Sequence, residues 1–255
     1  GVEKNADEAI KWHLKAAEQG IVESQYIIAT HYHMEQNHTE AIKWYTKAAE
    51  DGYARSQTIL GEIYYHGVGV EQNYTEAVKW FTAAAEQGVG IAQYYLGNCY
   101  YAGNGVEQNY TEATKWTALA AEQGYAKAQH NLAIAYEEGI GVEANPAEAV
   151  KWYHKAAEQG IMESQCNLGS LYYIGNGAEQ NYTEAVKWFT AAAEQGSSMA
   201  QLYLGYCYYK GYGTTQDYVK AVNWYRKSAE QDFAEAQYWL ALCYYDGEGV
   251  DKDPT

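Results

Sequence analysis

The sequence predicts an all-α protein, built as a solenoid of stacked helix–turn–helix repeats with a 36-residue period. Seven tryptophans are separated by 32 residues once and then by 36 residues five times: Trp12, Trp44, Trp80, Trp116, Trp152, Trp188 and Trp224. Around each one runs a closely similar pattern, Asn-x-x-Glu-Ala-x-x-Trp, followed by Ala-Ala-Glu and a glycine. A fixed period of this length indicates one supersecondary unit stacked on copies of itself, an open array rather than a closed enzyme core.

The first half of each repeat predicts one helix that ends at a glycine pair. In residues 89–124, the apolar side chains Ala92, Leu96, Cys99 and Tyr100 stand at i, i+4, i+7 and i+8, the spacing of one helix face. Glycines then end the helix, because glycine tolerates the left-handed backbone found at helix C-termini. The pairs are Gly67/Gly69, Gly103/Gly105, Gly139/Gly141, Gly175/Gly177, Gly211/Gly213 and Gly247/Gly249. Repeat 1 lacks this segment between Tyr32 and Asn37, so we expect a tighter turn there.

The second half predicts a capped helix that buries the tryptophan. Asn109 stands at the N-cap, and Glu112 follows three residues later as the partner of a capping box. Ala113, Trp116 and Ala120 form the apolar stripe, and we expect the indole to fill the gap between the two helices of its hairpin. The N-cap position reads Asn5, Asn37, Asn73, Asn109, Asn145, Asn181 and Asp217 along the chain.

This pattern assigns residues 1–255 to a single array. Its repeats cover approximately 1–20 (partial), 21–52, 53–88, 89–124, 125–160, 161–196, 197–232 and 233–255 (partial). The chain therefore opens just before a second helix, and Asp253-Pro254 resembles the cap and first position of another one. We expect 14 helices in a fragment of a longer array, with bare terminal faces that can pack end to end with other copies.

Composition excludes several classes of function. The formal net charge of −16 is spread over the repeats, which disfavours nucleic acid as a partner. No run approaches the length of a membrane span. His31 and His33 form the one tight histidine pair, but they point to different helix faces, so we expect neither metal nor cofactor. Cys99, Cys207 and Cys243 share one repeat position, too far apart for disulfides, and with Cys166 they are expected to be free thiols.

The recurring residues resemble the Sel1-like repeat family, relatives of the tetratricopeptide repeats. The shared motifs are Leu-Gly-x-x-Tyr, Gly-x-Gly-Val, Ala-x-x-Trp-Tyr/Phe and Ala-Ala-Glu-x-Gly, and they cover essentially the whole chain. The resemblance implies a right-handed superhelix whose first helices line the concave side. It also implies a non-enzymatic scaffold or adaptor that binds a partner peptide or protein, most naturally in the concave groove.

Two alternatives to a scaffold remain open. One is a ligand-binding or hydrolytic protein of the penicillin-binding branch of this family, although Ala157 and Gln165 stand where that branch has its cysteine pair. The other is a passive structural spacer. Residues 71–88 and 179–196 are identical, which favours recent duplication in a bacterial array. Together with the family's host-interaction members, this favours a bacterial, extracytoplasmic or secreted protein, with the compartment left open.

Candidate partner-binding residues follow from the concave positions that the resemblance implies, namely 3, 6, 10 and 13 of each repeat. In the last two repeats these positions are largely apolar or aromatic, on an otherwise acidic chain. We expect them to form a contiguous exposed patch for an apolar peptide flanked by basic residues. The candidates are Met199, Leu202, Tyr206, Tyr209, Tyr238, Leu242 and Tyr245, with Tyr94 and Tyr101 in repeat 3. The competing explanation is that tyrosine at positions 6 and 13 belongs to the family consensus and packs against neighbouring helices.

Overall fold

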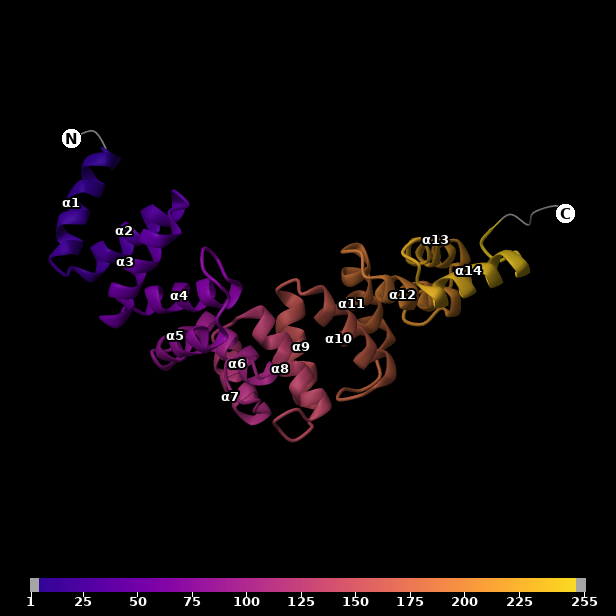
Figure 1. Ribbon diagram of the computed structural model, residues 1–255. Helices are drawn as coiled ribbons and strands as arrows, with labels where there is room; N and C mark the ends of the chain where they lie inside the picture. The colour runs from indigo at the N-terminus through magenta and orange to yellow at the C-terminus, as the bar shows by residue number, and fades with distance from the viewer. Residues whose placement is uncertain (1–4, 251–255) are drawn as a thin grey trace. The chain divides into compact units, whose positions relative to one another are not determined.

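The computed structural model describes residues 5–250, which form fourteen α-helices and no strand (Figure 1). The first seven are α1 (Ala6–Glu18), α2 (Val22–Met34), α3 (His38–Glu50), α4 (Ala54–His66), α5 (Tyr74–Glu86), α6 (Gly90–Ala102) and α7 (Tyr110–Glu122). The last seven are α8 (Ala126–Glu138), α9 (Pro146–Glu158), α10 (Met162–Ile174), α11 (Tyr182–Glu194), α12 (Ser198–Lys210), α13 (Tyr218–Ala229) and α14 (Ala234–Asp246). The predicted all-α solenoid and its helix count are confirmed.

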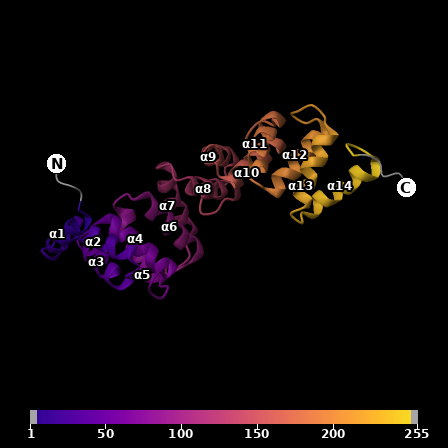
Figure 2. The same cartoon turned by 90° about the horizontal axis from the view of Figure 1, so that it is seen from above.

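The chain divides into two compact units, residues 1–125 with α1–α7 and residues 126–255 with α8–α14. Within each unit every helix packs against the next one along the chain, so the hairpins stack in sequence order (Figures 1 and 2). Even-numbered helices are the first helices of the repeats and odd-numbered helices are the second. None of the helices in residues 5–250 combines the length and the apolar character that a membrane span requires.

All seven predicted N-caps are confirmed, but the reciprocal half of the capping box is not formed. The side-chain oxygen of Asn109 accepts a hydrogen bond from the Glu112 N–H at 3.1 Å. The Asn109 N–H, however, donates to the carbonyl of Tyr100 on the preceding helix at 2.9 Å. Because that donor is already used, the Glu112 carboxylate pairs with Lys115 at 3.3 Å instead. The cap therefore also ties the second helix to the first.

The two glycines of each loop have different roles. Gly67 and Gly103 end α4 and α6 with φ of 72° and 74°, in the left-handed region. The second glycine allows close approach to the preceding repeat, since a Cβ on Gly213 would lie 2.1 Å from the carbonyl oxygen of Tyr182, the first residue of α11. In repeat 1 only residues 35–37 join α2 to α3, with Gln36 at φ 60°, which confirms the tighter turn.

The tryptophans lie elsewhere than predicted. Trp80 packs in a cluster with side chains of α3 and α4, so it wedges between its own first helix and the second helix of the preceding repeat. The gap inside a hairpin is filled by the next residue: Phe81 is fully buried, and its ring contacts the position of Gly61 on α4. One helical residue turns the side-chain direction by about 100°, which separates these two roles.

Burial of the tryptophans is correspondingly uneven. Trp44, Trp80 and Trp188 are only 5–7% exposed, as expected. Trp116, Trp152 and Trp224 are half-buried. Trp12 is 61% exposed, so the prediction is wrong for this residue, because within the described residues no preceding repeat packs against α1. The cysteine prediction is confirmed: Cys99, Cys166, Cys207 and Cys243 are all free and buried.

Candidate protein-interaction surface

The candidate residues lie on the outward face of three first helices, α6, α12 and α14. Repeat positions 4, 5, 8 and 11 face the core in α6 and α12, as Ala200, Gln201, Leu204 and Cys207 do in α12, and positions 4 and 11 are buried in α14. Helical periodicity leaves positions 3, 6, 10 and 13 on the other side. The candidate residues share this side of the helix, and they differ in how much of each side chain reaches the surface.

An aromatic cluster occupies this face in the second unit. The ring centroid of Trp239 lies 5.2 Å from that of Tyr206, 5.6 Å from that of Tyr209 and 6.0 Å from that of Tyr238. These distances are typical of interacting aromatic pairs. We call the four residues the α12–α14 aromatic cluster. The Lys210 ammonium lies 5.1 Å from the Tyr209 ring centroid, so a cation borders the cluster.

Trp239 joins three of the predicted residues but was not itself predicted. It stands at position 7 of its repeat, outside the 36-residue tryptophan series. Its ring stacks on the buried Tyr225, with centroids 6.0 Å apart and planes 17° apart. An eighth tryptophan outside the period was the sequence signal that could have identified it. Its packing holds the surrounding tyrosines in place.

The most exposed of the candidate side chains lie on α14. Tyr238 is 61% and Tyr245 is 86% exposed, and Met199 is exposed on α12. Tyr206, Tyr209 and Leu242 are half-buried. α14 is the last helix among the described residues, so no following first helix covers Tyr238 and Tyr245, whereas Trp239 covers part of Tyr206.

The expectation that Leu202 is exposed is wrong. Its side chain is 9% exposed and belongs to the core cluster that also contains Ala236 and Cys243 of α14. The following first helix covers position 6 at this point, and the small Ala236 lets it approach closely. Leu202 therefore supports the surface from below and offers little area to a partner.

The two candidates of repeat 3 lie in the first unit and form separate contacts. Tyr101 is exposed, and its ring centroid lies 5.4 Å from that of Tyr110. Tyr94 is half-buried, 5.6 Å from Tyr95, which stacks on Phe81. The structure therefore joins Tyr206, Tyr209 and Tyr238 through Trp239, and places Tyr94 and Tyr101 in a different local environment.

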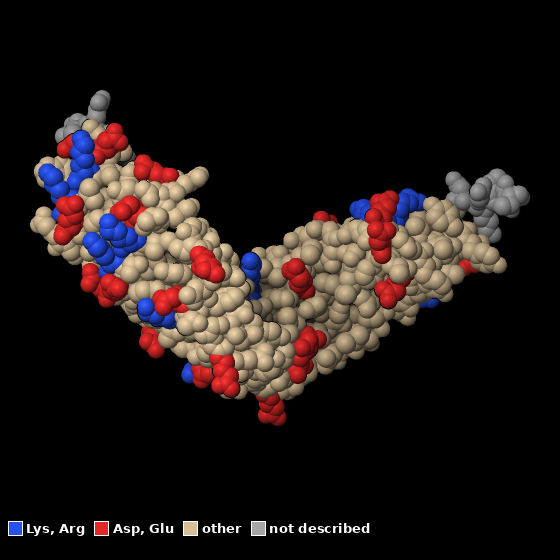
Figure 3. Space-filling view, viewed as in Figure 1, with Lys and Arg blue, Asp and Glu red and all other residues tan. Residues whose placement is uncertain are grey.

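An acidic group lies beside the aromatic cluster, in addition to the Lys210 ammonium. A hydrogen bond to the Glu248 carboxylate raises the pKa of the Tyr209 hydroxyl, with desolvation adding to the effect. Glu235 and Asp246 are exposed on α14 itself. In Figure 3 acidic side chains are scattered over both units, and lysine and arginine side chains are most numerous over the N-terminal helices but also appear toward the C-terminal end. Among residues 5–250, no group of three or more His, Cys, Asp or Glu side chains could hold a metal ion.

Comparison with known protein families matches nearly every residue of the chain to one repeat profile. The profile described as Sel1 repeat matches residues 1–21, 23–53, 54–89, 90–125, 126–161, 163–197, 198–233 and 234–255. A search of the curated proteins finds no match.

Two solved structures from bacteria are similar over most of the chain. One is a protective antigen present in uropathogenic Escherichia coli strains, which displays an SLR fold. It is 40% identical with a TM-score of 0.90, over 96% of this chain and 54% of that one. The other is a Sel1 repeat protein from Oxalobacter formigenes, 33% identical with a TM-score of 0.80, over 90% of this chain and 94% of that one. The chain thus spans about half the length of the Escherichia coli antigen.

Proposed function

The chain belongs to the Sel1 repeat family, and we propose that it is a protein-interaction scaffold that binds a partner through the α12–α14 aromatic cluster. In this proposal the chain carries no catalytic site and no cofactor. The bacterial source of both similar structures supports a bacterial origin.

The observation that carries this proposal is the α12–α14 aromatic cluster, in which Tyr238 is exposed and Tyr206, Tyr209 and Trp239 are half-buried. Water-exposed tyrosine and tryptophan rings are enriched at the centres of protein interfaces, because they bury a large apolar area and lose little side-chain entropy. Here Tyr238 is exposed while Trp239, packed on Tyr225, fixes the neighbouring ring positions. A partner therefore meets a surface that is already ordered.

The partner's chemistry follows from the surroundings of the cluster. Exposed Met199 and Tyr245 extend the apolar area on α12 and α14. Glu235 and Asp246 add negative charge on α14, on a protein whose formal net charge is −16. A peptide or helix with apolar or aromatic anchors and flanking Lys or Arg residues fits this arrangement, since opposite charges steer and orient association.

Panning a random peptide library against the protein tests the proposal without knowledge of the natural partner. We expect selected peptides to combine an apolar anchor with basic residues. Tyr238→Ala together with Met199→Ala should weaken their binding by at least about tenfold, the loss expected when interface anchors are truncated. Leu119→Ala is the matched control, because Leu119 is an exposed apolar side chain on a second helix.

The same measurements separate the alternatives. A passive spacer predicts no selected peptide whose binding depends on Tyr238 and Met199. A ligand-binding or hydrolytic protein predicts covalent or saturable labelling by a fluorescent β-lactam, competed by unlabelled antibiotic. Either result, with circular dichroism showing intact variants, would count against the scaffold proposal.

A further inference from the structure

Glu62 is a half-buried carboxylate on α4, near the middle of the first unit. It stands at position 10 of its repeat, and the side chains at this position in the other repeats are uncharged: Thr30, Asn98, Ile134, Ser170, Tyr206 and Leu242. Glutamates in the first turns of second helices have lysine partners, as Glu76 has Lys79 at 3.3 Å. None of the salt bridges among residues 5–250 includes Glu62. Its charge therefore belongs to one repeat alone and is explained neither by a helix cap nor by an ion pair.

Aromatic side chains of α4 and α6 lie beside this carboxylate. Tyr65 and His66 follow Glu62 by three and four residues, so the three side chains share one face of α4. Tyr95 of α6 packs on that face, with its ring centroid 5.4 Å from that of Tyr65 and 6.0 Å from that of His66. The ring centroid of Tyr94 lies 5.6 Å from that of Tyr95. We call these five residues the Glu62 site.

The Glu62 carboxylate has lost water without gaining a full countercharge. Burial raises the pKa of the Glu62 carboxyl, and the attraction of His66 offsets only part of this effect. Burial and then the Glu62 charge also raise the pKa of the Tyr95 hydroxyl, which places these two groups close together. Arg55 is the nearest lysine or arginine on α4, and it precedes Glu62 by seven residues, about 10 Å along the helix axis. A cation from another molecule would therefore stabilise this carboxylate.

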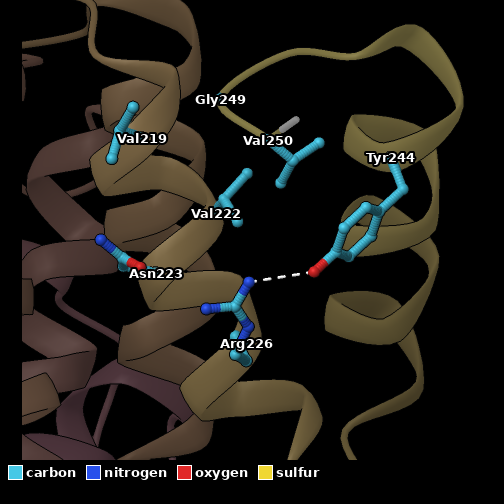
Figure 4. Close-up of a pocket in the computed structure, with 7 residues that line it drawn as sticks. All are labelled: Val219, Val222, Asn223, Arg226, Tyr244, Gly249 and Val250. Atoms are coloured by element: carbon cyan, nitrogen blue, oxygen red, sulfur yellow. Dashed lines mark hydrogen bonds between the residues drawn. The ribbon is translucent and has the colours of Figure 1, made fainter. Parts of the chain in front are cut away.

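Elsewhere the chain's own cations lie against its aromatic side chains. The Lys47 ammonium is 4.2 Å from the ring centroid of Trp44. In the second unit Arg226 donates a hydrogen bond from Nη2 to the Tyr244 hydroxyl at 3.0 Å (Figure 4). Within residues 5–250 no lysine or arginine lies over a tyrosine ring of the Glu62 site. The site thus combines a carboxylate with aromatic rings and lacks a lysine or arginine of its own.

Core packing fixes the rings of the Glu62 site. Tyr95 stacks on the fully buried Phe81, with ring centroids 4.9 Å apart and planes 3° apart. Tyr65 and Tyr95 both pack against the core cluster that contains Phe81 and Leu96. Both tyrosines are half-buried, so part of each side chain remains accessible. A ligand therefore meets ordered rings, and binding requires little reorganisation.

We propose that the Glu62 site binds an arginine side chain of a partner protein. A guanidinium group can donate two hydrogen bonds to the carboxylate and lie against a tyrosine ring, because it is planar and weakly hydrated. A lysine ammonium is more strongly hydrated and lacks the planar shape. The formal net charge of −16 favours the approach of a basic segment. This site belongs to α4 and α6 of the first unit, so it is a further site that does not depend on the α12–α14 aromatic cluster.

An NMR titration of the whole chain with a capped glycine–arginine–glycine peptide tests this proposal. A peptide with citrulline in place of arginine is the matched probe, because citrulline has nearly the same shape and no charge. We expect the arginine peptide to bind with a dissociation constant on the order of 1 mM. It should shift the signals of the Glu62 carboxyl and the Tyr95 ring, and it should lower the pKa of Glu62, since a bound cation favours the ionised form. The citrulline peptide should do neither.

Two pairs of variants separate the site from general attraction to an acidic protein. Glu62→Gln keeps the size of the side chain and should weaken binding of the arginine peptide by at least about tenfold. Glu86→Gln changes the net charge equally and is the control, because Glu86 is exposed at the end of α5. Tyr95→Leu should also weaken binding, whereas Tyr95→Phe keeps the ring and should retain most of it. Circular dichroism confirms that each variant is folded.

The outcomes distinguish this site from the surface proposed above. The Tyr238→Ala/Met199→Ala chain should bind the arginine peptide as the wild type does, so either proposal can fail without the other. Three results would each overturn the arginine site: no shift of the Glu62 or Tyr95 signals up to about 20 mM peptide, equal binding of the citrulline peptide, or equal affinities of the Glu62→Gln and Glu86→Gln chains.

Discussion

The side-chain amide of Gln87 donates a hydrogen bond from Nε2 to Oε1 of Gln57 at 2.7 Å, between the end of α5 and the start of α4. Gln57 in turn donates from Nε2 to the Ala49 carbonyl at 3.0 Å, at the end of the preceding second helix. One buried amide thus connects three helices and satisfies a carbonyl that the helix terminus leaves free. The same pair recurs as Gln123–Gln93, Gln159–Gln129, Gln195–Gln165 and Gln231–Gln201.

Repeat 1 lacks the outer member of this pair. Asp51 stands where the other repeats have glutamine, at the C-terminus of α3. As a result Gln25 Oε1 is buried without a hydrogen-bond partner, while its Nε2 still faces the Ala17 carbonyl at 3.5 Å. A buried acceptor left unpaired costs free energy.

Asp51→Gln should therefore stabilise the first unit. The new amide reaches Gln25 Oε1 as Gln87 reaches Gln57, and we expect the free energy of unfolding to rise by about 1–2 kcal/mol. Urea unfolding measures the change. Asp51→Asn is the control: it removes the same unfavourable charge from the helix C-terminus, but its side chain is one methylene shorter. Equal stabilities of the two variants would show that the hydrogen bond contributes nothing.

Tryptophan substitutions should differ sharply along the chain. Trp80→Ala removes an indole that is 7% exposed and packed among three helices, and should cost about 3–5 kcal/mol. Trp12→Ala removes one that is 61% exposed, and should cost less than about 1 kcal/mol. Thermal and urea unfolding of the two variants check the contrast. Similar losses would mean that burial at this repeat position does not determine stability.

Much of this fold could be predicted from the sequence, because the helix caps and helix ends of each repeat depend on residues that are close together in the chain. Asn109 as a cap and Gly103 as a helix end depend on side-chain chemistry within one turn, so both were predictable. The different roles of Trp80 and Phe81 depend on which neighbouring helix each residue faces, and periodicity within one helix does not specify that.

The candidate surface was only partly predictable for the same reason. The outward face of α12 and α14 follows from helical spacing, but the burial of Leu202 and the central place of Trp239 depend on how closely α14 approaches α12. The glutamine pairs are a different case. Gln57 and Gln87 recur at fixed repeat positions in the sequence, and the buried Gln57 shows that a recurring polar residue can be part of the core.

Gly61→Ala should destabilise the α4–α5 hairpin. The new Cβ would lie 2.4 Å from the Phe81 ring, too close without movement of a fully buried side chain. Alanine improves helix propensity by about 1 kcal/mol, yet overpacking typically costs about 1–3 kcal/mol, so we expect little gain or a net loss of stability. A double-mutant cycle with Phe81→Leu measures the coupling. Strictly additive effects would show that the ring does not set this requirement.

Buried thiols should make stability fall at alkaline pH. Burial raises the pKa of Cys99 and of Cys207 to about 12, against about 8.5 in an unfolded chain. Between these values the folded state keeps a proton that the unfolded state releases. The stabilisation is complete below about pH 8.5 and is lost as pH rises, by up to about 1.4 kcal/mol per pH unit for each thiol. Urea unfolding between about pH 8.5 and 9.5 gives the thiols their greatest weight, because tyrosines in an unfolded chain ionise mainly near pH 10. The Cys99→Ala/Cys207→Ala variant should show a clearly shallower decline, and an unchanged decline would assign the pH dependence to other groups.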